Sequence, residues 1–247
     1  MKPGRILIFT AAALLLVGSF FLPNAVAGIS DSNRLNSLRL IDSQSVSFNA
    51  VPELSIPERI ILIANSYTEI MALNSGNAMS EEEARARAIR ELSRFISGGP
   101  FDFSFSTCVV EESSAAFAID TENPTVNMII WELTLVDAVE NTAMLTIDDE
   151  TGIIVKIIYR QGSKNQNSIT PVGAPPGQME KELSANAVRV AEMMAAYYDL
   201  PIILGDYYFD GGLSYYRSDF TDENSIISMF GVVRPAGFTM NERTSFR

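Results

Sequence analysis

The sequence predicts an α+β fold in which a helix packs on an antiparallel sheet, in two such modules. Apolar residues recur at helical spacing before residue 97, and from residue 101 to 159 they alternate with polar ones, which is the period of a β-strand. The order of a helix and then strands occurs again after residue 178. Residues 161–177 are rich in Gly and Pro and predict a linker between the two halves.

The first 27 residues have the pattern of an export signal. Lys2 and Arg5 precede an apolar run over 6–22, and small residues offer a cleavage site before Gly28. We therefore expect an exported chain that is extracellular or held at the outer face of the cell membrane. If the signal is not cleaved, residues 6–22 are an N-terminal anchor, because this run lies near the lower length limit for spanning a bilayer.

Two capping boxes predict the first two helices. Ser55 and Ser80 are each followed three residues later by a glutamate, and apolar residues at helical spacing come after both. We expect helices near 56–73 and over 81–97, where a Gly-Gly-Pro stop follows. Residues 28–55 are polar and have no clear period, so we expect an irregular lead-in there.

The alternating segments between 101 and 159 predict an antiparallel meander that packs against these helices and completes a module over 56–160. Its last hairpin closes on the acidic turn 148–152, whose Asp and Gly residues suit a tight turn, and we expect a positive φ at Gly152. The acids could also bind calcium or act as an acid/base pair. Because the loop is too short for the spaced ligands of a calcium hand, a structural turn is the main interpretation.

Three segments of this module resemble a PepSY-type domain: 80–84 at the start of a helix, 131–135 as a strand and 145–154 as a hairpin. The resemblance extends over residues 80–159. It implies a PepSY/cystatin-like fold and a place among exported proteins of Gram-positive bacteria that regulate peptidases or bind peptides. The sequence contains no protease domain, so the intramolecular chaperone role of protease propeptides is not expected.

The second half predicts a smaller α+β module over 178–247. An apolar stripe between 183 and 198 predicts a helix, and three strands are expected at 202–209, 213–220 and 226–233. Four tyrosines flank the turn between the first two strands and are the candidate ligand-binding residues: Tyr207, Tyr208, Tyr215 and Tyr216. They could form a platform for a peptide or a sugar, or simply pack across the strands.

The composition excludes several classes of function. Histidine is absent, so a Ser-His-Asp triad and imidazole metal ligands are excluded, and the single cysteine, Cys108, cannot make an intramolecular disulfide or a cysteine-rich zinc site. The formal net charge of −12 makes nucleic acid a poor partner. We therefore expect no catalytic residues, no cofactor and no metal.

These features together predict an exported, non-catalytic binding or regulatory module. Its expected partner is an envelope protein or a peptide, and the PepSY resemblance adds the regulation of an envelope peptidase. The alternative is a structural envelope or spore-associated protein that assembles through its sheet edges. A carboxylate-based hydrolase is the third interpretation, and it would require two facing acids in a cleft.

Overall fold

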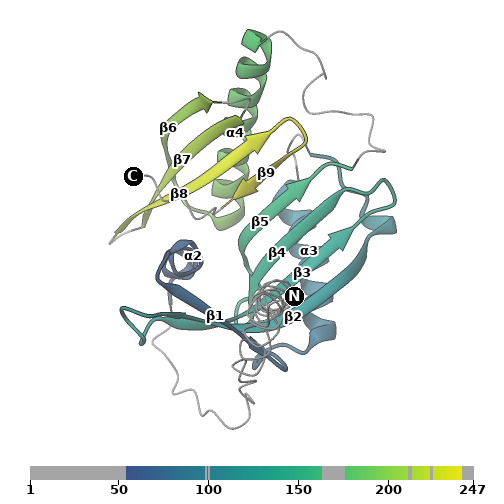
Figure 1. Cartoon of the computed structure of the whole chain (residues 1–247), viewed down its shortest axis with the longest axis vertical. Coiled ribbons are helices and arrows are strands. Elements are labelled where there is room, and N and C mark those ends of the chain that lie inside the picture. Colours follow the sequence, from purple (N-terminus) through teal and green to yellow (C-terminus); the bar gives the residue numbers. More distant parts are fainter. Residues whose placement is uncertain are drawn as a thin grey trace, which may run out of the picture. The chain divides into compact units, whose positions relative to one another are not determined.

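The computed structural model describes residues 54–97, 99, 101–162, 176–210, 213–222 and 225–240. At 176, 202–207, 220–222 and 225–227 it describes the backbone alone. The expected signal, the lead-in up to residue 53 and most of the expected linker lie outside these residues. The protein is α+β, and its described strands form one antiparallel sheet in the order β1-β2-β3-β4-β5-β9-β8-β7-β6 (Figure 1).

The helices are α2 (Ile56–Ala64), α3 (Glu81–Ile96) and α4 (Pro176–Tyr198), with a short 3-10 helix, η1 (Phe105–Thr107). The strands are β1 (Thr68–Leu73), β2 (Val109–Asp120), β3 (Asn127–Val136), β4 (Thr142–Asp148), β5 (Ile154–Arg160), β6 (Ile202–Asp210), β7 (Leu213–Asp222), β8 (Ser225–Arg234) and β9 (Gly237–Met240). None of the helices among the described residues combines the length and the apolar character needed to cross a membrane.

Both capping boxes are present. The side chains of Ser55 and Ser80 accept a hydrogen bond from the glutamate backbone three residues on, and each glutamate carboxylate accepts one from the serine backbone. The helix expected near 56–73 is wrong in its second half, because the chain turns after Ala64 and continues as β1. The structural reason is tertiary: β1 pairs along its whole length with β2, and those long-range hydrogen bonds outweigh the helical spacing of its apolar residues.

The strand expected at the start of the meander is also wrong. Residues 101–108 form a loop with η1, and the first meander strand begins at Val109. The ring of Phe101 packs on Tyr159 and Phe238, with centroids 5.4 and 4.4 Å away. Phe101, which the alternating pattern placed on a strand, therefore packs into the core from a loop.

Both long helices lie on the same face of the sheet. α3 contacts strands β2 to β5, α4 contacts β6 to β8, and the two helices contact each other. We call this side the helix face and the opposite side the open face. Figure 1 shows α2 on the other side of the sheet from α3. The central helix-face side chains are almost fully buried: Trp131, Leu133, Leu135, Ala143, Leu145, Ile147 and Ile157.

The two halves expected as separate modules share this one sheet. β5 of the first half pairs with β9 of the second, with Ile157 opposite Met240. β9 was not among the three strands predicted for that half. The C-terminal end of α4 adds to the junction, since the hydroxyl of Tyr197 accepts a hydrogen bond from Ile154 N–H at 3.0 Å and the hydroxyl of Tyr198 donates to Ile154 C=O.

Candidate functional site

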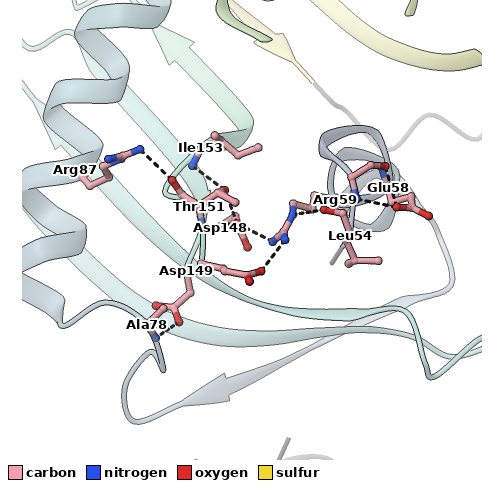
Figure 2. A network of polar contacts seen from close by, with 11 residues as sticks. Leu54, Glu58, Arg59, Ala78, Arg87, Asp148, Asp149, Thr151 and Ile153 are labelled. Carbon is pink, nitrogen blue, oxygen red and sulfur yellow. Dashed lines mark hydrogen bonds and ion pairs between the residues drawn. The ribbon is translucent and has the colours of Figure 1, made fainter. Parts of the chain in front are cut away.

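The two aspartates of the acidic turn are buried, and they point to opposite faces of the sheet (Figure 2). Asp149 is 2% exposed. Its carboxylate accepts hydrogen bonds from the backbone N–H groups of residues 77, 78 and 79, at 2.8, 2.6 and 3.1 Å. It also accepts one from the indole N–H of Trp131 at 2.7 Å. Asp149 therefore fixes the loop that leads into α3.

Asp148 holds α2 on the other face. Its carboxylate pairs with Arg59 of α2 at 2.8 Å, and both side chains are at most 5% exposed. The second guanidinium nitrogen of Arg59 meets Glu150 at 2.6 Å. Burial by itself lowers the pKa of Arg59, but the hydrogen bonds and charges of Glu150 and Asp148 more than offset this, so its pKa is raised.

We call Asp148 and Asp149, together with Arg59, Glu150, Trp131 and the backbone of residues 77–79, the acidic latch. Asp149 accepts four hydrogen bonds, and one oxygen of Asp148 makes the ion pair with Arg59 and accepts two hydrogen bonds from Thr151. Such contacts within the protein are the arrangement of a structural turn. Gly152 has the positive φ, 72°, expected from the sequence, and a Cβ at this position would meet the side chain of Arg87. Among the residues that the structure describes, no group of three or more His, Cys, Asp or Glu side chains could hold a metal ion.

Two adjoining hollows lie on the open face. The first has a volume of about 320 Å³ and extends from Ile63 of α2 and Ile70 of β1 to Lys156 of β5. The second, of about 200 Å³, extends from Glu112 of β2 to Ile158 of β5. Both hollows are lined by Glu132, Thr146 and Lys156, so they meet along one line across the strands.

That line is set by the strand register. Ser114 lies opposite Glu132, Glu132 opposite Thr146, and Thr146 opposite Lys156. We call these four residues the charged row. Because neighbouring strands are about 4.8 Å apart, the backbones of Glu132 and Lys156 are separated by about 10 Å. Neither charged side chain makes a hydrogen bond or ion pair with any part of the chain that the structure describes.

Apolar side chains flank the charged row. Met144 is 41% exposed and Ile70 is 44% exposed, and each lines one of the hollows. Exposed apolar side chains beside unpaired charges are the usual composition of a recognition surface, where apolar groups supply affinity and charges supply specificity.

The predicted tyrosines are divided between the two faces. Tyr208 lies opposite Tyr215 on the open face, with rings stacked at 4.8 Å and Tyr208 47% exposed. Tyr216 lies on the helix face, buried against Met194 of α4. The backbone of Tyr207 pairs with that of Tyr216, and its side chain lies outside the described ones. The outward pair is therefore Tyr208 and Tyr215, on the same face as the charged row.

The charged row was not predicted from the sequence. Strand alternation assigns Glu132 and Lys156 to polar positions, but their alignment depends on a register that runs through three strands. No family model, curated protein or solved structure matches this chain. The PepSY resemblance therefore stays a prediction, and the geometry of the open face carries the functional argument.

Proposed function

We propose that the protein is a non-catalytic binding module that holds an extended peptide segment on the open face of its sheet. The observation that carries the proposal is the charged row, where Glu132 and Lys156 lie between exposed apolar side chains and have no ion-pair partner among the described residues. A folded chain gains nothing from leaving such groups together in two hollows, whereas a ligand gains both apolar contact and charge pairing there.

The dimensions of the open face suit a peptide. The hollows reach from β1 to β5, which is four strand spacings, or about 19 Å. An extended chain rises about 3.3 Å per residue, so about six residues would cross this distance. A segment of that length is the usual size of a linear recognition motif, and its main chain needs no pre-existing structure.

The surroundings of the acids support a binding role over hydrolysis. The aspartates of the acidic latch are buried, accept contacts from the protein itself and line neither hollow, so they are not placed to move a proton in a substrate. Glu112 and Glu132 line one hollow together, but both are exposed. An acid/base pair needs two different environments that keep one carboxyl protonated and the other ionised, and these two share the same one.

The test is peptide binding by variants of the open face. Met144→Asp and Ile70→Asp should each weaken the binding of a selected peptide by about tenfold, since both place a carboxylate in an apolar contact. Ile61→Asp is the matched control, because Ile61 is also 44% exposed but lines neither hollow. Isothermal calorimetry measures the affinity, and circular dichroism confirms folding. Equal affinities for all four proteins would refute the proposal.

The proposal extends to location and partner. An exported chain that begins at Gly28 would meet peptides at the cell envelope, and the PepSY resemblance favours a segment of an envelope peptidase. Mass spectrometry of the exported protein tests the N-terminus. A pull-down from the native envelope tests the partner, and a peptidase captured by the wild type but not by Met144→Asp would support regulation. Capture that does not differ between the two proteins would argue against the open face.

A second candidate function is assembly through β1, which is an outer strand of the described sheet. Ile70 and Ala72 are exposed on it, and β1 contains no Pro, Lys or bulge that would discourage pairing with another strand. Ala72→Lys should therefore reduce self-association in sedimentation velocity if β1 edges join. A wild-type protein that stays monomeric at high concentration would exclude this role.

A further inference from the structure

We infer that the peptide bound on the open face carries a basic and an acidic side chain three positions apart. The inference rests on the peptide-binding function proposed above and adds the charge pattern of the ligand. It follows from the distribution of charge over the face and from the spacing of the charged row.

Between β2 and β5 the open face is electrically polarised. Apart from Asp148, which is paired with Arg59, its acids in these strands lie on β2 and β3, where Glu112 and Glu132 are exposed. Its bases lie on β5, where Lys156 and Arg160 occupy open-face positions, opposite Thr146 and Thr142 of β4. Met144 and the two threonines on β4 separate the two sides without charge. A ligand that complements this face has its positive end over β2 and β3 and its negative end over β5.

The spacing selects the positions of these charges in the peptide. About 10 Å separates the backbones of Glu132 and Lys156, because two strand spacings lie between them. In a β-strand, side chains on one side recur every two residues, or about 6.6 Å. In the polyproline II conformation they recur every three residues, or about 9.3 Å, which matches the charged row much better.

The polyproline II conformation also suits a chain that crosses the strands. Its backbone makes no internal hydrogen bonds and stays solvated, so it needs no sheet edge. On the open face the backbone groups of β2 to β5 are already used in strand pairing, which leaves side chains as the contacts. The peptide would thus rest on Met144 and Ile70 and be aligned by its charges.

The experiment titrates the purified protein with three capped hexapeptides at low ionic strength. They carry Lys and Glu, Lys and Lys, or Glu and Glu at positions two and five, with Pro and Val elsewhere. The wild type should bind the Lys/Glu peptide roughly fivefold more tightly than either same-charge peptide. Lys156→Glu should come to prefer the Lys/Lys peptide, and Glu132→Lys the Glu/Glu peptide. Peptides with the charges two or four positions apart should bind the wild type more weakly.

Glu69→Lys is the control variant, since Glu69 is exposed on β1 but lines neither hollow, and it should keep the wild-type preference. If the three peptides bind equally while Met144→Asp weakens all of them, the charge pattern is wrong and the peptide-binding function stands. If Met144→Asp changes none of them, both proposals fail. A monomer–dimer equilibrium that shifts in Lys156→Glu would assign the face to a second copy and overturn the inference.

Discussion

The aspartates of the acidic turn show how burial changes the role of a residue. If the aspartates were exposed, they would suggest a cation site or a turn that tolerates substitution. Asp149→Asn would then lower the free energy of unfolding only slightly. In the structure Asp149 is 2% exposed and accepts four hydrogen bonds from protein donors. An ionised carboxylate only accepts hydrogen bonds, so it suits a site that is lined only by N–H donors.

We therefore predict that Asp149→Asn destabilises the protein by about 2–4 kcal/mol. The amide would turn an NH2 group toward backbone N–H donors, and the charge that strengthens the remaining bonds would be lost. Urea denaturation measures the change. Glu150→Gln is the control and should cost less than about 1 kcal/mol, since Glu150 is 62% exposed. Similar costs for the two substitutions would contradict the structural role of Asp149.

Two buried tyrosines at the end of α4 should make the free energy of unfolding depend on pH in the alkaline range. Burial is the main cause that raises the pKa of Tyr197 and Tyr198 above the ordinary value of 10. The unfolded chain therefore loses these protons at a lower pH than the folded one. Their contribution to the free energy of unfolding is full below pH 10 and is lost as the pH rises above it.

Urea denaturation between pH 8 and 11 should thus show a loss of stability that is smaller in Tyr198→Phe. The phenylalanine has no proton to lose, although it also removes the hydrogen bond to Ile154 and lowers stability near neutral pH. An unchanged slope in Tyr198→Phe would show that alkaline unfolding has another cause.

At the scale of elements, local signals determine where helices begin, and long-range pairing determines where they end. The capping boxes at Ser55 and Ser80 need only residues three apart, so both starts were predicted. The end of α2 depends on β2, which lies far along the chain and pairs with residues 68–73. The spacing of apolar residues within 56–73 contains no information about the pairing with β2.

Ser80→Ala should lower the stability of the protein by about 1 kcal/mol, since it removes the side-chain acceptor from the start of α3. Ser93→Ala is the matched control in the same helix. Ser93 is exposed within α3, and alanine favours the helix there, so its effect should be neutral or slightly stabilising. Thermal unfolding of both variants tests this. A Ser80→Ala variant as stable as Ser93→Ala would mean that the cap contributes nothing.

At the scale of the molecule, the junction of the two halves carries a prediction about proteolysis. Limited digestion should cut within 161–177, where the sequence predicts a linker. The two fragments should then stay together in size-exclusion chromatography, because β5 pairs with β9 and the ring of Phe95 on α3 lies 5.2 Å from that of Tyr197 on α4. Fragments that elute separately would restore two independent modules, and preferred cutting within 128–159 would contradict the meander.

The sequence by itself determined the α+β class, the starts of α2 and α3, the three strands β6 to β8 of the second half and the positive φ of Gly152. These features depend on neighbours within a few residues, where capping, alternation and turn chemistry act. Only the tertiary structure decided that one sheet joins the halves, that Asp149 is buried and that Glu132 and Lys156 share a row. Each of these depends on strand register and on short strands such as β9, and a register is the sum of many weak cross-strand contacts that no local pattern encodes.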